Sequence, residues 1–364
     1  MLYYRMVKNF MLEISTFTVN RLGLKKEVMR IVTKKEASTL MVVIAFATVY
    51  LVWGSTYFFI QVAVQHFPPF IMGSLRFLAS GILLFAWCVF RKENLWNWQQ
   101  IKPALITGLL LLFIGNGAVI WAEQKLPSSL VAVLVSASPL WFVILDKPKW
   151  KENFTNRSII IGLSIGFIGV ILLFSERTAN AFSSAGSIAQ VAGLLVVVIG
   201  SISWAGGSLY SKYKSNGSTV VNTAWQMLAA SVAFTAFSLL NNEWTGFQWQ
   251  SVTPNAWLAV LYLVVMGSLA GYSAYVWLLQ VRPATQVSTY AYVNPVVAVL
   301  LGVFFAGEHM SLLQIIGLAV ILTSVLLINL ARYRKEQKII SINKAEEPGI
   351  PVVIAGTKEK AVFD

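Results

Sequence analysis

The stretch that decides the fold is residues 271–308, GYSAYVWLLQVRPATQVSTYAYVNPVVAVLLGVFFAGE. It contains two apolar segments joined by a very short turn, and the second segment carries a proline inside its own span. Much of the pattern already occurs in residues 115–139, GNGAVIWAEQKLPSSLVAVLVSASP. One tryptophan and two prolines recur 156 residues later, as Trp121 and Trp277, Pro127 and Pro283, Pro139 and Pro295. Repetition at such a period indicates a duplicated folding unit.

The composition indicates a membrane protein. Apolar residues make up 57% of the chain and charged residues 12%, whereas soluble proteins average roughly 25% charged residues. Between Thr39 and Leu330 the chain reads as apolar runs of about 18–23 residues, and about 20 suffice for a helix to cross a bilayer. We therefore predict an all-α polytopic membrane protein.

The apolar runs divide the chain into ten predicted transmembrane helices and two flanking segments. The first five helices form a unit over residues 39–174 and the last five a unit over residues 188–330. Residues 1–38 are predicted to be a basic cytosolic segment, and residues 331–364 a disordered cytosolic tail. The predicted spans are 39–60, 69–90, 103–122, 128–145, 157–174, 188–210, 219–240, 255–278, 284–305 and 311–330.

The distribution of Lys and Arg predicts the orientation. With the N-terminus in the cytoplasm, 25 of the 28 basic residues fall in cytoplasmic segments and two, Lys125 and Arg177, in outer loops. Such an excess on one side follows the positive-inside rule, so both termini are predicted to be cytoplasmic. The net charge of +13 is thereby explained as a topology signal, and nucleic acid is not expected as a partner.

The two units match helix by helix. Trp53-Gly54-Ser55 corresponds to Trp204-Ala205-Gly206, and the segment that starts at Arg76 corresponds to the one that starts at Gln226. Each unit has five predicted spans, an odd number, so the second enters the membrane from the opposite side. Inverted repeats of this kind usually move a substrate by alternating access around a site between them.

Three stretches carry a family resemblance: WGSTYFFIQVAVQHFPPFIMGSLRFLASG, GNGAVIWAEQKLPSSLVAVLVSASPLW and YSAYVWLLQVRPATQVSTYAYVNPVVAVLLGVFFAGE. Over roughly residues 40–330 the chain resembles the ten-helix EamA-type branch of the drug/metabolite transporter superfamily. The first unit departs from the pattern, because its fourth span ends on Asp146-Lys147-Pro148 where the second has Gly307-Glu308. The resemblance implies a proton-coupled or facilitated exporter of amino acids, metabolites or drugs in a bacterial inner membrane.

Arg76 is the one basic residue in the interior of a predicted span, because Arg157 stands at the edge of the span 157–174. A charge at membrane depth costs at least about 2.5–3.5 kcal/mol and needs a partner or a watery cavity. One interpretation is a contact to an anion or carboxylate in the transport pathway. The other is a structural tie to helix-end carbonyls, or a side chain that reaches up to the membrane surface.

Glu123 ends the third predicted span, seven residues after Asn116 and on the same helical face. A buried carboxylate at a cavity could take up and release a proton, which would make Glu123 the coupling residue. The alternative is an interfacial carboxylate in water or paired with Lys125, and pairing with Arg76 is also open.

Aromatic and small polar residues are concentrated in spans 1, 3, 6, 8 and 9. Facing a central cavity, they would bind a small amphipathic solute by stacking and hydrogen bonds. The alternative is that the rings form interfacial belts and the hydroxyls bond within their own helices. The candidate substrate-binding residues are Arg76 and Trp53, Thr56, Tyr57, Asn116, Trp204, Tyr272, Tyr275, Tyr292 and Asn294.

Pro139 and Pro295 occupy matched places inside spans 4 and 9. Proline removes a backbone donor and favours a kink, so the pair is interpreted either as one gate in each half or as fixed curvature. No metal-ligand spacing, nucleotide loop or nucleophile motif is present, which argues against an enzyme, a metal site and a bound cofactor.

The sequence thus predicts a secondary transporter of small organic solutes, with export favoured by the resemblance and with proton coupling as a hypothesis. Its partners are a small-molecule substrate, the lipid bilayer and protons, and it acts as a monomer or weak homodimer. A flippase for lipids or lipid-linked intermediates, and a membrane receptor or scaffold without transport, are the alternatives.

Overall fold

A computed structural model describes residues 38–126, 128–183, 188–306, 311–313 and 315–328. The chain divides into two units, Met1–Val43 and Ile44–Asp364. Of the first, the structure describes Ser38–Val43, where helix α3 begins. The predicted tail 331–364, and the predicted N-terminal segment apart from Ser38, lie outside the described residues.

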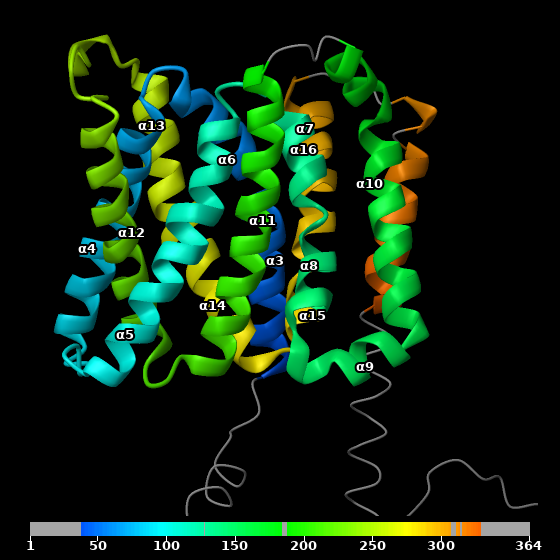
Figure 1. Cartoon of the computed structure of the whole chain (residues 1–364), viewed down its shortest axis with the longest axis horizontal. Coiled ribbons are helices and arrows are strands. Elements are labelled where there is room, and N and C mark those ends of the chain that lie inside the picture. Colours follow the sequence, from blue (N-terminus) through cyan, green and yellow to red (C-terminus); the bar gives the residue numbers. More distant parts are fainter. Residues whose placement is uncertain (1–37, 127, 184–187, 307–310, 314, 329–364) are drawn as a thin grey trace, which may run out of the picture. The chain divides into compact units, whose positions relative to one another are not determined.

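The described residues form helices and contain no β-strand, in agreement with the predicted all-α class. Several predicted spans are built from more than one helical segment (Figure 1). In chain order the main elements are α3 (Thr39–Val64), α4 (Pro69–Phe90), α5 (Trp98–Thr107), η1 (Gly108–Asn116), α6 (Gly117–Ala122), α7 (Ser128–Val135), α8 (Ser138–Leu145), α9 (Trp150–Thr155), α10 (Arg157–Ser183), α11 (Ile188–Lys214), α12 (Thr219–Leu240), α13 (Pro254–Tyr262), η4 (Leu263–Tyr272), α14 (Ser273–Val281), α15 (Ala284–Val287), α16 (Tyr290–Ala306) and a last helix, Ile315–Ile328.

Six helical stretches among the described residues are long and apolar enough to cross a membrane, so the chain is an integral membrane protein. A seventh is added if α9 and α10, which meet at 89°, are counted as one bent span. The six are Thr39–Val64, Pro69–Phe90, Trp98–Ala122, Val191–Lys214, Thr219–Leu240 and Pro254–Val281.

Spans 4 and 9 are not the single helices that we expected. The first is interrupted between α7 and α8, and the second between α15 and α16. Hydroxyls bond to nearby carbonyls at both breaks: Ser138 Oγ donates to the Val135 carbonyl at 2.6 Å, and Thr289 Oγ1 to the Gln286 carbonyl at 2.7 Å. Such bonds compete with the helical ladder. Pro139 consequently lies in the first turn of α8, where its missing N–H costs nothing, whereas Pro295 does lie inside a helix.

Helices α4 and α12 show the duplication most directly. Each has 22 residues, and each is followed by a residue with positive φ, Lys92 at 55° and Asn242 at 54°. The two helices pack antiparallel against each other, because Gly73 lies against Phe234 while Gly81, further along α4, lies against Leu228, earlier on α12. Matched helices of the two units therefore run in opposite directions.

A second matched feature is a pair of π-helices, η1 and η4. η1 ends on Asn116 and η4 ends on Tyr272, two positions that are 156 residues apart. π-helical segments are rare and are frequent at functional sites. Both interrupt a span in its middle and thereby change which face the following residues present.

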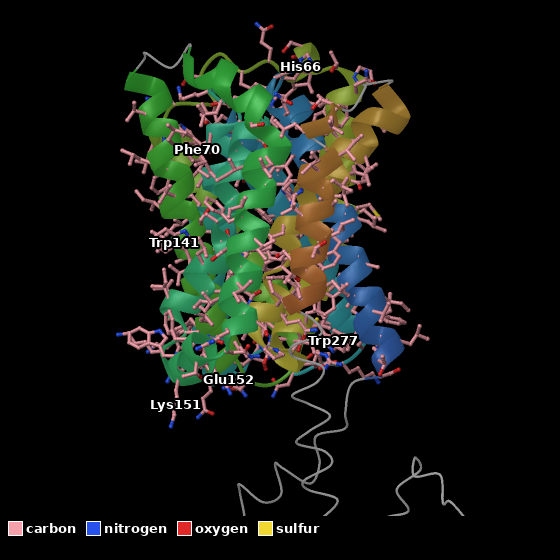
Figure 2. The ribbon with its side chains drawn as sticks, turned by 90° about the vertical axis from the view of Figure 1, so that its right-hand side faces the viewer. His66, Phe70, Trp141, Lys151, Glu152 and Trp277 are labelled. Carbon is pink, nitrogen blue, oxygen red and sulfur yellow. The ribbon has the colours of Figure 1, made fainter. Side chains whose placement is uncertain are left out.

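The loops of this unit lie at opposite ends of the helical bundle. Figure 2 shows His66 at one end, and Lys151 and Glu152 at the other. His66 follows α3, whereas Lys151 and Glu152 belong to α9, which precedes the bend into α10.

Candidate functional site

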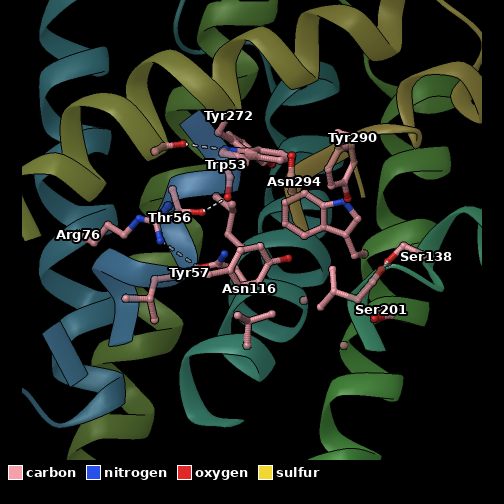
Figure 3. A pocket seen from close by; sticks show the side chains of 18 of the residues that line it. Trp53, Thr56, Tyr57, Arg76, Asn116, Ser138, Ser201, Tyr272, Tyr290 and Asn294 are labelled. Carbon is pink, nitrogen blue, oxygen red and sulfur yellow. Dashed lines mark hydrogen bonds between the residues drawn. The ribbon is translucent and has the colours of Figure 1, made fainter. Parts of the chain in front are cut away.

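A cavity lies between the two repeats, and side chains from both line it (Figure 3). The cavity has a volume of about 70 Å³, several times the roughly 10–15 Å³ that a single water needs on the same measure. Its lining residues are Trp53, Thr56, Tyr57, Ile60, Arg76, Phe77, Leu112, Gly115, Asn116, Val119, Val135, Ser138, Gly200, Ser201, Trp204, Gly267, Tyr272, Tyr290 and Asn294.

Four aromatic residues form one wall of the cavity. Trp53 of α3 meets Trp204 of α11 edge to face, with ring centroids 5.5 Å apart, and meets Tyr290 in the same way at 5.0 Å. Trp204 also contacts Tyr272 at 6.3 Å. These separations lie in the range where aromatic pairs attract each other. Trp53 and Tyr272 are buried, so these two rings do not belong to an interfacial belt.

Hydrogen bonds hold the two tryptophans in place. Trp53 Nε1 donates to the Gly267 carbonyl at 3.1 Å, and Trp204 Nε1 donates to Tyr275 Oη at 3.0 Å. Tyr275 Oη also lies 2.6 Å from Ser208 Oγ. Tyr275 is fully buried and is not a lining residue, so it supports Trp204 from behind the wall.

Arg76 brings a positive charge to the cavity. Its Nε donates to Ser268 Oγ at 2.9 Å, and its Nη1 lies 3.4 Å from Asn116 Oδ1. The side chain is 4% exposed, which does not fit a side chain that reaches the membrane surface. Among the described residues, no Asp or Glu oxygen lies within 4.0 Å of the guanidinium. Arg76 ties helices through neutral groups, and its charge stays without a counter-ion there.

Gln226, at the position that matches Arg76, makes neutral ties. It accepts a hydrogen bond from Tyr272 Oη at 2.9 Å and donates from Nε2 to Thr107 Oγ1 at 2.9 Å. Tyr272 in turn matches Asn116, the residue that Arg76 contacts. The same contact is therefore made in each repeat, with a charged residue in the first and a neutral one in the second.

Glu123 is buried beside the cavity but does not line it. Neither carboxylate oxygen has a hydrogen-bond partner within the part of the chain that the structure describes, and neither Lys125 nor Arg76 pairs with it there. Lys125 lies instead over the Trp121 ring, at 5.1 Å from its centroid. Burial without a partner raises the pKa of Glu123 well above its usual value.

The other predicted residues fall into two groups. Thr56, Tyr57 and Asn294 line the cavity, although the Thr56 hydroxyl donates to the Trp53 carbonyl of its own helix at 2.8 Å. Tyr292 lies elsewhere, in an apolar cluster with Ile159 and Ile321, and its hydroxyl donates to the Leu163 carbonyl at 2.9 Å. Pro139 and Pro295 are buried outside the cavity lining.

Several lining residues escaped the sequence analysis. Tyr290 was not among the candidates, yet as the first residue of α16, after the break in span 9, it lines the cavity. Gly267 and Gly115 belong to the π-helices, where ordinary helical spacing does not predict which residues share a face. Apolar lining residues such as Ile60 and Leu112 carry no signal that separates them from core residues.

Among the described residues, no cluster of three or more His, Cys, Asp or Glu side chains could hold a metal ion. A membrane-spanning bundle with a cavity between two repeats occurs in many membrane transporters. The model of the EamA-like transporter family matches residues 40–175 and 191–330, once for each repeat. The chain therefore belongs to the EamA-like transporter family, and the predicted resemblance is confirmed.

Two relatives and one solved structure illustrate the similarity. The uncharacterized inner membrane transporter YedA of Escherichia coli strain K12 is 37% identical over 79% of this chain and 90% of its own length. Protein PecM of Dickeya dadantii is 24% identical over 81% of this chain and 95% of its own length. A solved crystal structure is similar in fold, with a TM-score of 0.64, 21% identity, and coverage of 82% of this chain and all of the other.

Proposed function

We propose that the protein is a secondary transporter that moves a small organic solute across the inner membrane by alternating access. The observation that carries the proposal is a central cavity bounded by corresponding residues of both repeats, Trp53 with Trp204 and Asn116 with Tyr272. A ligand held there contacts both halves at once. Rocking of one repeat against the other would then expose it to one side of the membrane at a time.

The proposed architecture is ten transmembrane helices in two inverted five-helix units, residues 39–174 and 188–330. The antiparallel packing of α4 against α12 supports the inversion, and the two family matches support the boundaries. The interrupted spans α7–α8 and α15–α16 are candidates for the moving parts, because a break absorbs a change in direction more easily than a continuous helix. Pro139 and Pro295 lie next to or within these parts and are proposed as gating residues.

Proton coupling is proposed to run through Glu123. Its carboxyl is buried without a hydrogen-bond partner among the described residues. Tyr57, a cavity residue, packs against the cluster that contains Ala122 and Leu126, and it lies close enough to Glu123 to interact with its charge. Protonation of Glu123 is expected to favour one orientation of the cavity and its ionisation the other, because only a wet environment solvates the carboxylate.

Export is the proposed direction, with both termini in the cytoplasm and the α9 end of the bundle facing it. The name of YedA supports the inner membrane, and the excess of Lys and Arg supports the orientation. The protein is proposed to act as a monomer or weak homodimer, because the cavity lies within one chain. Its partners are then the solute, protons and the bilayer.

Counterflow in reconstituted vesicles tests the transport function. Vesicles loaded with an unlabelled solute mixture should accumulate a labelled member of that mixture faster than protein-free vesicles. A Trp53→Ala, Trp204→Ala double variant removes the aromatic wall from both repeats, so it should lose the accumulation. Equal uptake by the protein-free vesicles and the wild type, across all solutes tried, would refute transport.

The coupling residue is tested separately with Glu123→Gln. We expect this variant to retain counterflow, which needs no proton movement, and to lose accumulation driven by a pH gradient. Glu93→Gln, in an exposed loop, is the matched control and should retain both. Gradient-driven accumulation that survives in Glu123→Gln would exclude Glu123 as the coupling group.

A further inference from the structure

The cavity presents a single charge. Arg76 is the only ionised side chain among its lining residues, which include no Asp or Glu. Its Nε and Nη1 contact Ser268 and Asn116, while Nη2 makes no hydrogen bond to any residue that the structure describes. A buried guanidinium with a free donor facing a cavity is an incomplete site, because a charge at membrane depth needs a counter-ion or water.

The surroundings of Arg76 determine the sign of the ligand's charge. The neighbours that approach the guanidinium are the Phe77 ring at 5.0 Å, the hydroxyl of Ser268 and the amide of Asn116, all of them neutral. A cationic ligand would meet repulsion that no carboxylate of the cavity lining offsets, since like charges repel strongly in a poorly solvated site. A singly charged anion would neutralise the site, and a guanidinium fits a carboxylate in particular.

Gly267 fixes the distance between the charge and the aromatic wall. A Cβ added there would lie 2.9 Å from Arg76 Nη2, and the Gly267 carbonyl accepts the hydrogen bond from Trp53 at 3.1 Å. The guanidinium and the Trp53 edge thus meet at the same bare stretch of η4. When the anionic group of a ligand binds Arg76, an aromatic ring only a few bonds away in the same ligand can reach the aromatic wall.

We propose that the solute of this cavity is an aromatic monocarboxylate, whose carboxylate binds Arg76 and whose ring stacks in the wall of Trp53, Trp204, Tyr272 and Tyr290. The proposal rests on the proposed transport function and specifies its substrate class. An ammonium group is not part of the recognised ligand, because no acidic side chain lines the cavity. The site thereby prefers a simple carboxylate to the amino acid with the same ring.

Binding to the purified full-length protein tests the charge requirement with four probes of similar shape. The probes are 3-phenylpropionate, 3-phenylpropan-1-ol, 3-phenylpropylamine and phenylalanine. Isothermal titration calorimetry measures the dissociation constant of each. The anion should bind about ten- to hundredfold more tightly than the alcohol, as expected for a charge-assisted hydrogen bond. The amine and the amino acid should bind more weakly than the anion, and acetate, which lacks the ring, should also bind more weakly.

Arg76→Gln assigns the preference to the guanidinium. Glutamine occupies the matched position 226, so the variant is expected to fold. It should bind 3-phenylpropionate and the alcohol with similar affinity, whereas Arg76→Lys should keep part of the preference for the anion. Ser80→Ala is the control on the same helix, because Ser80 is buried, bonds to the Arg76 carbonyl at 2.7 Å and does not line the cavity. It should keep the wild-type preference.

The outcomes separate the substrate class from the transport function. Absence of 3-phenylpropionate binding, or binding of the amine or alcohol as tight as that of the anion, overturns the substrate class. A preference for the anion that persists in Arg76→Gln overturns the role of Arg76. Counterflow of other solutes would still establish transport in both cases. Binding of the anion with no counterflow of any solute would leave a binding site and refute the transporter.

Discussion

Around the cavity, Trp53 and Asn116 of the first repeat correspond to Trp204 and Tyr272 of the second, and all four line it. The correspondence fails where the first repeat has charge. Arg76 corresponds to Gln226, and Glu123 corresponds to Leu279, which is fully buried. The backbones of the two repeats are alike, and the third span of each repeat contains a π-helix. Duplication has kept the geometry around the cavity, while the two matched positions that carry a charged residue, Arg76 and Glu123, lie in the first repeat.

The difference has a physical basis. Two guanidinium groups at one small cavity would repel each other and would each need a counter-ion. A neutral glutamine at the second position still ties α12 to the spans on both sides, through Thr107 and Tyr272. One charged and one neutral member of the pair therefore give a site with a defined sign. The predictions that follow vary one repeat at a time and use its counterpart for comparison.

The largest expected effect comes from adding one methyl group to the first π-helix, at Gly108. The same change in the second π-helix, at Gly267, is its counterpart. In Gly108→Ala the new Cβ would lie 2.4 Å from the Gln226 carbonyl oxygen and 2.8 Å from its Cα, and backbone cannot yield locally. We expect a loss of about 3 kcal/mol, at the upper end for overpacking, measured by unfolding in a denaturing detergent. In Gly267→Ala the nearest atom is the end of the Arg76 side chain, so a loss of about 1 kcal/mol is expected.

Gly206→Ala serves as the control for both variants. Its nearest neighbour would be a Leu145 methyl at 3.9 Å, which is an ordinary contact, so its stability should equal that of the wild type. If Gly108→Ala were as stable as Gly206→Ala, the close approach of η1 to α12 would be wrong.

The second prediction concerns the ties of the two matched residues. Gln226→Leu removes the buried amide and leaves its two partners, Tyr272 Oη and Thr107 Oγ1, each short of a hydrogen bond. We expect a loss of about 2 kcal/mol, as for buried groups left unsatisfied. Asn116→Leu removes only a long contact of 3.4 Å to Arg76 and should cost less. The same detergent titration measures both, and the reverse ranking would show that the Asn116 tie is the stronger one.

The third prediction uses the carboxylates that follow the matched helices. Glu243, after α12, accepts hydrogen bonds from the Ile71 and Phe70 amides at 2.9 Å and 3.3 Å and so caps the start of α4. Glu93, at the same place after α4, is exposed. Glu243→Ala should cost about 1 kcal/mol, as for other N-terminal caps, and Glu93→Ala should have no measurable effect. Equal melting temperatures for the two variants would contradict the cap.

The sequence was sufficient for the features that depend on composition and repetition. The apolar runs predicted α3, α4 and α12 closely, since a bilayer-long helix has a simple signature. The offset of 156 residues predicted that Asn116 and Tyr272 correspond. The cavity is lined by eight of the ten residues proposed as ligand contacts, together with Tyr290.

The features that the sequence did not show depend on local backbone geometry and on contacts between distant segments. Ser138 and Thr289 bond to backbone carbonyls and break spans 4 and 9, and no periodicity marks such breaks. The sequence placed Asn116 and Glu123 on one helical face, yet Asn116 lines the cavity and Glu123 does not. Tyr292 appeared equivalent to Tyr290 by composition, yet it lies in an apolar cluster against Leu163.

The smallest expected effect is the pH dependence that Glu123 introduces and Leu279 lacks. Because burial raises the pKa of Glu123 in the folded protein, the native state binds more protons than the unfolded state above pH about 4. Stability therefore falls as pH rises from there towards the folded pKa. Glu123→Gln, which cannot ionise, should lose this slope, so its melting temperature should exceed that of the wild type by a margin that grows as the pH rises above about 4. Parallel melting curves for the two proteins across that range would show that Glu123 ionises as freely in the folded chain as in water. The two repeats would then differ in charge at Arg76 but not at Glu123.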